Sequence, residues 1–301
     1  MQKNKFRNCL QILPVLFFMA FVSASCIKDD LSGCPSPHVS GVTLQVKAFD
    51  ADGNPLDGGT IKDITLYVFN ADKTLLDILH VSLSELVTLD YPGHDNLKLV
   101  AWGNGRQGGQ TLPALRQGDH LETAFVSLIQ PQTRITYPVA GSPDDLFYGT
   151  IDIQTSADAL SARELPLRRK VSGVAVTARR LKEYVGSSDG DFHYILRKTG
   201  SMLDFYGLPN GTDVSYRPEA SFNDRGDFVS STFNILPTEE ELRIDIYHRG
   251  VLRTTIISDS NGKPLRVAEG RLLNVLVDFD GAINVEIKVT DWGKEEIWKE
   301  F

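Results

Sequence analysis

Apolar and polar residues alternate one by one over many short stretches of this chain. In residues 42–46 the apolar Val42, Leu44 and Val46 are separated by Thr43 and Gln45. The same period of two recurs in the stretches 64–68, 97–101, 174–176, 244–246, 273–279 and 285–289. Because successive side chains of a strand point to opposite faces of a sheet, this pattern predicts strands that have one face on a core.

Short segments rich in Gly, Asn, Asp and Pro separate the predicted strands. They are Asp52-Gly53-Asn54-Pro55, Asn210-Gly211, Asn261-Gly262 and Asp280-Gly281. Their residues tolerate the positive φ that tight hairpin turns need. Helical periodicity is scarce, and strands at this spacing without long intervening helices favour antiparallel sandwiches over parallel α/β sheets.

A polar segment rich in Ala and Ser runs from Gln154 to Pro166 and separates two β-patterned halves. Each half is long enough to bury a core of its own. The sequence therefore predicts two β-sandwich domains in tandem, at residues 39–155 and 166–301. Residues 1–25 and 26–38 precede them and have a different character.

The first 25 residues have the anatomy of a signal peptide. Lys3, Lys5 and Arg7 precede an apolar run from Leu10 to Val22, and no acidic residue occurs before Asp29. This run is shorter than the roughly 20 residues that span a bilayer. A permanent transmembrane helix is therefore the weaker alternative to a cleaved signal peptide.

Cys26 follows the small residues Ser23, Ala24 and Ser25. The arrangement resembles the lipobox at which lipoprotein signal peptidase cuts before an acylated cysteine, although Ser23 stands where a lipobox usually has Leu. The alternative is an ordinary secreted protein cut near Ala24, which would keep an odd exposed thiol. We therefore predict that Cys26 carries lipid.

The residues after Cys26 are Ile27 and then Lys28, Asp29 and Asp30. They resemble the Lys-then-acidic signal that sends lipoproteins to the cell surface in Bacteroidetes-type bacteria. A solvated tether is the plainer interpretation, and the two are compatible because a tether is polar in any case.

The charge and the cysteines of the mature chain exclude two further classes. Removal of the first 25 residues leaves 28 basic and 39 acidic side chains, a net charge of −11, so nucleic acid is not an expected partner. Cys9 leaves with the signal peptide and Cys26 is used for lipid. Cys34 is then the single cysteine of the body, which excludes an intramolecular disulfide.

No sequence motif supports a catalytic, cofactor or metal site. The segment 103–108 matches the dinucleotide fingerprint letter for letter, but Gly109 and Pro113 follow where a helix must begin, so we expect a loop. The segment 50–54 is followed by Pro55 and Ile61 where a calcium loop needs Gly and Glu. The six histidines are scattered along the chain. A hydrolase assembled from distant residues ranks third among the functional hypotheses.

Two sets of side chains allow both a plain and a functional interpretation. The basic runs 168–170 and 179–182 flank an apolar strand, where they either guard strand ends or form a docking patch for an acidic partner. Trp102, Tyr148, Tyr206 and Trp292 could form a sugar-stacking platform. Large rings on strands more often pack in a core, however.

The stretch from Cys26 to Pro35, Cys-Ile-Lys-Asp-Asp-Leu-Ser-Gly-Cys-Pro, resembles the start of the FimB-type fimbrial anchor lipoproteins. A looser similarity extends to residues 42–49, 66–69, 99–104 with its Trp-Gly-Asn end, and 289–292. The resemblance implies two transthyretin-like β-sandwich domains, a lipid anchor in the outer membrane and a non-catalytic role as the base of a fimbrial shaft.

Pilins related to this family join by donating a strand to a neighbour's sheet, which uses the unpaired amides and carbonyls of an open edge. The resemblance therefore implies fimbrial shaft subunits as partners by strand addition. We expect the edge to be either the first strand, 42–49, or the last strand, 283–290, unless both are interior strands. The alternative function is a surface lipoprotein that binds glycans or host proteins.

Overall fold

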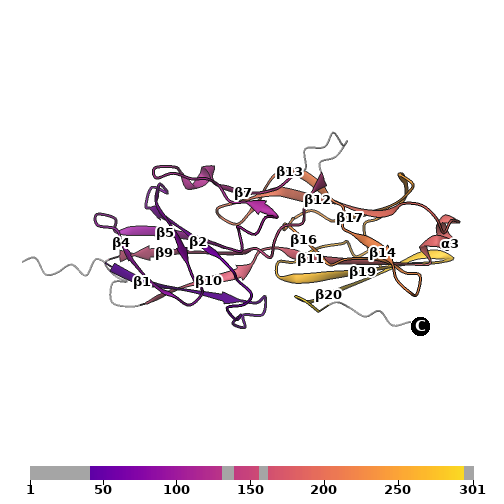
Figure 1. Cartoon of the computed structure of the whole chain (residues 1–301), viewed down its shortest axis with the longest axis horizontal. Helices are drawn as coiled ribbons and strands as arrows, with labels where there is room; N and C mark the ends of the chain where they lie inside the picture. The colour runs from indigo at the N-terminus through magenta and orange to yellow at the C-terminus, as the bar shows by residue number, and fades with distance from the viewer. Residues whose placement is uncertain (1–40, 131–138, 156–161, 295–301) are drawn as a thin grey trace, which may run out of the picture. The chain divides into compact units, whose positions relative to one another are not determined.

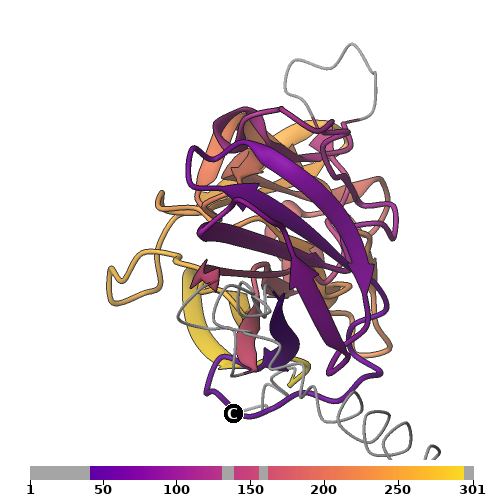
Figure 2. The same cartoon turned by 90° about the vertical axis from the view of Figure 1, so that its left-hand side faces the viewer.

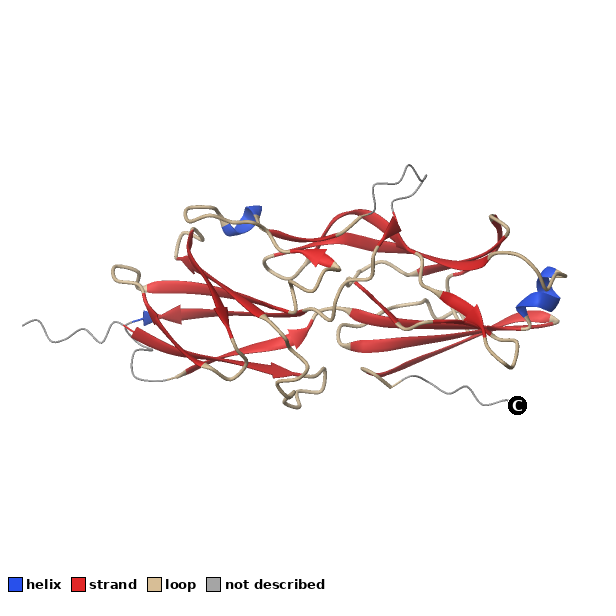
Figure 3. Ribbon diagram, viewed as in Figure 1, coloured by secondary structure: helices blue, strands red, loops and turns tan. Residues whose placement is uncertain are grey.

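Strands and connecting loops make up almost all of the protein, which confirms the all-β prediction (Figure 3). The computed structural model describes residues 41–130, 139–155 and 162–294. The alternating stretches of the sequence all lie in strands. The twenty strands are β1 (Gly41–Phe49), β2 (Ile64–Asn70), β3 (Leu75–Val81), β4 (Leu86–Asp90), β5 (Asn96–Gly103), β6 (Gln110–Thr111), β7 (Phe125–Leu128), β8 (Val139–Ala140), β9 (Phe147–Gln154), β10 (Arg163–Arg169), β11 (Ser172–Arg179), β12 (Phe192–Asp204), β13 (Pro209–Tyr216), β14 (Ala220–Phe222), β15 (Phe228–Ser230), β16 (Phe233–Ile235), β17 (Arg243–His248), β18 (Val251–Ile256), β19 (Arg271–Asp280) and β20 (Ala282–Asp291). Two short helices join them, η2 (Leu121–Thr123) and α3 (Leu181–Val185).

The first sheet has seven strands in the order β3-β2-β5-β9-β10-β1-β4 (Figure 1). Its strands from the first part of the chain, in indigo and purple, face the viewer in Figure 2. Most neighbours are antiparallel, but β1 and β10 are parallel. Along β1 every second residue is buried, as its alternation predicted.

One face of this sheet encloses a core of its own. Alternate residues of β1, β2, β5, β9 and β10 bury their side chains together there, including Leu44, Leu66, Leu99 and Leu167. These apolar side chains from both halves of the strand order meet, so the sheet is folded over its own inner face. This folding gives the sandwich character that the sequence predicted.

Two further sheets enclose the larger core. One has the strand order β14-β15-β11-β19-β20 with β16 also on β11. The other has the order β18-β17-β12-β13-β8, with β7 also on β12 and β6 on β7. Strands β11 and β19 are parallel over seven residue pairs, and β8 is parallel to β13. Their shared core includes Val176, Tyr194, Ile244 and Val275.

The sheets do not follow the boundary between the two predicted halves of the chain. Strands β6, β7 and β8 belong to the same sheet as β12 and β13, whereas β10 belongs to the first sheet. Tyr67 and Trp102, on the second face of the first sheet, pack against Phe205 from the β12–β13 turn, with ring centroids 4.8 and 6.1 Å away. The division into domains at 39–155 and 166–301 stays a prediction.

Three of the predicted turns lie between strands, and Gly53, Gly262 and Gly281 have positive φ there. The prediction of a hairpin turn at Asn210-Gly211 is wrong, because these residues lie inside β13. The turn between β12 and β13 lies earlier and ends with Gly207 and Leu208. Gly211 also has positive φ, but it adjoins an irregularity in the β12–β13 register, and bulges share this conformational demand with turns.

Candidate functional site

The predicted membrane-anchoring residues lie outside the described part of the chain. Cys26, Lys28, Asp29 and Asp30 all precede residue 41, as does Cys34. In the described ranges, no helix has the length and apolar character required to cross a membrane. The lipidated terminus and the surface-export signal therefore stay predictions.

The structure distinguishes the two strands that the sequence offered as an assembly edge. The first strand, β1, pairs with β10 on one side over residues 44–49 and with β4 on the other side over residues 41–45. Leu44 and Gln45 pair with a strand on both sides, and further along β1 the carbonyls of Val46 and Ala48 accept the N–H groups of Ser84 and Leu56. The hypothesis that the first strand is an open edge is therefore wrong, because sheet order inserts it between two strands.

The last strand, β20, lies at the end of its sheet. It pairs with β19 over ten residue pairs from Asp280–Ala282 to Arg271–Asp291, and no other described strand pairs with it. The Ser260 backbone N–H donates to the Val285 carbonyl at 2.9 Å, and the Val285 N–H donates to Ser260 Oγ at 2.7 Å. The backbone groups of Val285 therefore point away from β19.

In an antiparallel ladder the backbone groups of successive residues point alternately toward the partner strand and away from it. Because Val285 points outward, Ile287 and Val289 also present their N–H and carbonyl groups at the outer edge. Side chains on β20 are largely exposed, and Ile283 and Val289 are 39% and 49% exposed. At Ile287 and Val289 the outer edge of β20 thus pairs with no other strand of the described residues, and exposed apolar side chains lie along it.

A charged cluster stands where β20 ends. Arg271 forms ion pairs with Asp52 and Asp291, and the latter also pairs with Lys294 at 2.7 Å. The Lys294 ammonium, and after it the Arg271 guanidinium, hold the pKa of Asp291 below its usual range. This cluster connects the 50–54 loop to the start of β19, at Arg271, and to the end of β20, at Asp291.

The 50–54 loop uses its carboxylate for its own turn. Asp50 Oδ1 accepts the backbone N–H groups of Asp52 and Asn54 at 2.9 and 2.8 Å. The side-chain amide of Asn54 also donates to Asp50, and this bond is the main cause of its lowered pKa. Across the described residues, no group of three or more His, Cys, Asp or Glu side chains is arranged to hold a metal ion.

The basic runs have partners inside the protein. Arg169 is buried and donates two hydrogen bonds to Asp145, one of them 2.8 Å long from Nη2. Its guanidinium carbon lies 4.8 Å from the Phe147 ring centroid and 4.3 Å from that of Trp292. Lys170 pairs with Glu269 at 2.6 Å. These contacts favour the structural interpretation of this run over a docking patch.

Arg180 in the second basic run also has internal partners. It forms ion pairs with Asp278 and Asp280, the latter at 3.5 Å. Lys182 Nζ lies 4.2 Å from the centroid of the Phe222 ring. The second run is therefore also tied to the strands beside it.

The segment that matched the dinucleotide fingerprint is a loop, as expected. Its Asn104 has a φ of 57° and is 4% exposed. The side-chain oxygen accepts the Lys62 N–H at 2.7 Å, and the amide donates to the carbonyls of Thr60 and Asp145 at 3.0 and 2.9 Å. Asn104, at the Trp-Gly-Asn end of β5, therefore holds in place the loop of Thr60 and Lys62 and the loop of Asp145.

The four aromatic residues considered as a platform do not share one surface. Trp102 is fully buried and packs against Tyr148, with ring centroids 4.8 Å apart. Trp292 covers Arg169. Only Tyr206 is exposed, at 38% of its surface. The core-packing interpretation is therefore right for Trp102, whereas Tyr206 lies at the surface.

The described part of the chain is an all-β scaffold of three sheets, and comparisons with known proteins narrow this class. Residues 31–298 match the model of the family of Fimbrillin-A associated anchor proteins Mfa1 and Mfa2. This protein belongs to that family, which confirms the resemblance inferred from the sequence.

Relatives with a similar length support the family membership. The chain is 27% identical to the "Major fimbrium anchoring subunit FimB" of Porphyromonas gingivalis strain W83, an alignment that covers 95% of this chain and 96% of the relative. It is 28% identical to a second FimB sequence from that species, with 92% and 93% covered. The solved structure of the fimbrial anchor protein Mfa2 from Porphyromonas gingivalis has a TM-score of 0.61 at 18% identity, and covers 84% of this chain and 97% of that one.

Proposed function

We propose that this protein is a non-catalytic surface lipoprotein that attaches a fimbrial shaft to the outer membrane. The family match carries the proposal, because it spans residues 31–298 and so includes the described sheets and the part of the predicted tether from residue 31 onward. Similarity to fimbrium anchoring subunits along nearly the whole length of both chains supports the same role.

The membrane end of this function rests on Cys26. A lipid at the new amino terminus places the body at the membrane, and the polar residues Lys28, Asp29 and Asp30 then form its tether and export signal. A single acyl chain binds a membrane only marginally, so stable attachment requires the multiple acyl chains of a bacterial lipoprotein.

The membrane attachment is tested with two cysteine variants in the native host. Cys26→Ala should move the protein from the membrane fraction to the soluble fraction. Cys34→Ala is the matched control, since it removes the other cysteine of the predicted mature chain, and it should leave the protein in the membrane. Equal fractionation of both variants, or an unmodified mature terminus in mass spectrometry, contradicts the lipid anchor.

The anchoring role is tested by deletion of the protein from the host. Loss of a base subunit should release fimbriae into the medium or lengthen them, as seen by electron microscopy. Fimbriae of unchanged length and attachment in the deletion strain would refute the proposed function.

The shaft end of this function uses the outer edge of β20. Among the strands at the ends of the three sheets, β20 has ten residues, whereas β3, β4 and β18 have seven, five and six. The start of β3 is also closed, because Leu75 exchanges backbone hydrogen bonds with Gly118 and Asp119. A strand added beside β20 would gain the backbone groups of Ile287 and Val289.

Proline at one outward position tests this edge. Ile287→Pro removes an outward N–H without removing a bond to β19, a placement that edge strands tolerate. Ile287→Ala removes more of the side chain than proline does but keeps the N–H, and so serves as the control for lost side-chain contacts. Co-purification of the shaft subunit should be lost with proline and kept with alanine. If both variants retain the shaft subunit, β20 is not the edge that pairs.

A further inference from the structure

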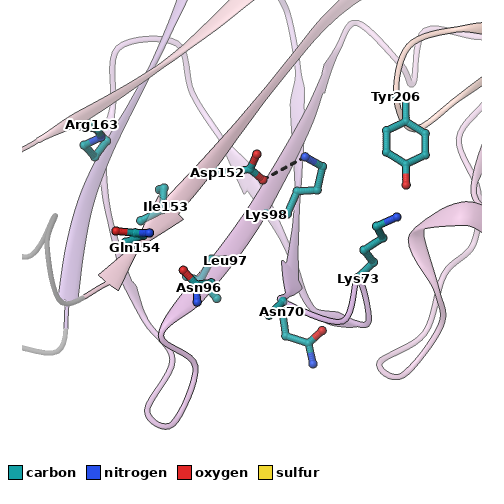
Figure 4. A pocket seen from close by; sticks show the side chains of 11 residues that line it. Asn70, Lys73, Asn96, Leu97, Lys98, Asp152, Ile153, Gln154, Arg163 and Tyr206 are labelled. Atoms are coloured by element: carbon teal, nitrogen blue, oxygen red, sulfur yellow. Dashed lines mark hydrogen bonds and ion pairs between the residues drawn. The ribbon is translucent and has the colours of Figure 1, made fainter.

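A polar groove lies at the ends of β2, β5 and β9, away from the outer edge of β20. It has a volume of about 570 Å³ and extends from the β2–β3 turn across the sheet to Tyr206 in the β12–β13 turn (Figure 4). Paired residues of neighbouring strands line it side by side, because Lys98 is opposite Asp152 and Asn96 is opposite Gln154.

Tyr206 is held in a fixed position at one end of the groove. Its backbone N–H donates to Asp204 Oδ1 at 2.9 Å, and its hydroxyl donates to Glu122 Oε1 at 3.3 Å. Lys73 pairs with the same Glu122 oxygen at 2.7 Å, and its Nζ lies 5.5 Å from the centroid of the Tyr206 ring. A ring that three polar contacts orient loses little conformational freedom when a ligand stacks on it.

The polar side chains of the groove present both donors and acceptors. Asn96 carries an amide that can donate and accept at once, whereas the side-chain oxygen of Asn70 already accepts the backbone N–H groups of Asp72 and Thr74 and leaves its amide nitrogen as a donor. Lys98 and Asp152 form an ion pair of 3.0 Å, so each holds the other in place across the floor. Groups of this kind match hydroxyls, which also donate and accept together.

Charge argues against an anionic ligand. Three cations line the groove, and each has an interaction inside the protein. Lys98 pairs with Asp152, Lys73 pairs with Glu122, and Arg163 is also engaged by the protein itself. Hydrogen bonds from Lys73 to Glu122 and Tyr206 raise the pKa of its ammonium group, and the Lys73 ammonium lowers the pKa of Glu122. The Lys73–Glu122 pair therefore stays charged and paired at neutral pH.

Apolar surface argues against a peptide side chain as the anchor. Leu97 and Ile153 border the groove, but they are only 2% and 1% exposed because they belong to the core of the first sheet. Peptide recognition relies on pockets for apolar or aromatic anchors, which these two buried side chains do not form. The exposed ring of Tyr206 instead offers one flat face.

We propose that this groove binds a neutral oligosaccharide, with one sugar ring stacked on Tyr206 and hydroxyls of a neighbouring sugar bonded to the amide of Asn96. Flat aromatic faces combined with a few placed polar groups are the general composition of small-ligand sites. This binding is independent of the fimbrial role, because it uses neither Cys26 nor the edge of β20.

The test is isothermal titration of the full mature lipoprotein, held in a detergent without a sugar headgroup. The probes are neutral hexasaccharides of α-glucan, β-glucan, β-mannan, β-galactan and β-xylan type, with oligogalacturonate as the anionic counterpart. At least one neutral probe should bind saturably. Tyr206→Ala should weaken that binding about tenfold, which corresponds to about 1.4 kcal/mol.

Three variants make the result specific. Tyr184→Ala removes an exposed tyrosine on α3 and should leave the affinity unchanged. Tyr206→Phe keeps the ring and should restore binding even where alanine harms folding, which a thermal melt detects. Asn96→Ala should also weaken binding. Failure of all five neutral probes, binding of oligogalacturonate alone, or binding that survives both Tyr206→Ala and Asn96→Ala overturns the proposal.

Discussion

Replacement of Arg169 by alanine is expected to lower the free energy of unfolding by about 3 kcal/mol. Removal of one partner from a buried ion pair typically costs about 3–5 kcal/mol, because the other charge is left without compensation. The Arg169 side chain is 4% exposed, but that of Asp145 is 28% exposed, so water can partly solvate the remaining carboxylate. The pair contribution therefore lies at or below the low end of this range.

The aromatic contacts of Arg169 add to this cost. The guanidinium lies within 5 Å of both Phe147 and Trp292, and each such contact contributes roughly 0.5–1 kcal/mol. Trp292 directly follows β20, whereas Phe147 begins β9 in the first sheet. One side chain thus joins two sheets, and its loss should unfold both together.

The assay is urea unfolding at 25 °C, followed by tryptophan fluorescence and by far-UV circular dichroism. Coincidence of the two transitions licenses a free energy. Arg180→Ala is the matched control, because the Arg180 side chain is 44% exposed where that of Arg169 is 4% exposed, and the expected loss is less than about 1 kcal/mol. If Arg169→Ala and Arg180→Ala destabilise the protein equally, the buried-pair reasoning is refuted. A double-mutant cycle with Asp145→Ala then isolates the pair.

Three further variants test other parts of the structure. Asn104→Asp keeps the acceptor for Lys62 but loses both donors to carbonyl groups, so urea unfolding should reveal a loss of about 2–4 kcal/mol. Trp102→Ala empties a buried site and should cost about 3–5 kcal/mol in the same assay, and a loss below about 1 kcal/mol would contradict its place in the core. Burial, and after it the Arg217 cation, lowers the pKa of His193 from 6.5. The stability that neutral His193 provides is thus present above pH 6.5 and is lost as pH falls through the lower folded pKa. The fall in melting temperature between about pH 7.5 and pH 5 should be smaller in His193→Gln, and an equal fall in both proteins would exclude this contribution.

Local alternation was sufficient to predict the strands, because each strand with one buried face repeats its apolar residues at period two. Strand order was not predictable in this way. The parallel pairing of β1 with β10 joins residues more than a hundred positions apart, and it turned the first strand into an interior one. The prediction of a turn at Asn210-Gly211 failed for a different reason, since bulges and turns both need residues that tolerate positive φ.

The buried position of Arg169 follows from the alternation of residues along the strand, but the adjacent basic residues suggested a solvated position instead. Leu165, Leu167 and Arg169 occupy alternate positions of β10 and are all buried, so the arginine continues the inward face of the strand. Inside a run of three basic residues this position resembled a solvated strand end. The groove beside Tyr206 left no local signal, because segments from five separate parts of the chain form it.

The interior position of β1 determines how the body would respond to mechanical tension. If lipid fixes the chain at Cys26, a pull on the shaft is resisted where the tether enters β1 at Gly41. Six residue pairs with β10 and five with β4 hold this strand from both sides. A force along the strand loads these ladders in shear, so their hydrogen bonds share it and must rupture together. An outermost strand could instead be peeled away one bond at a time.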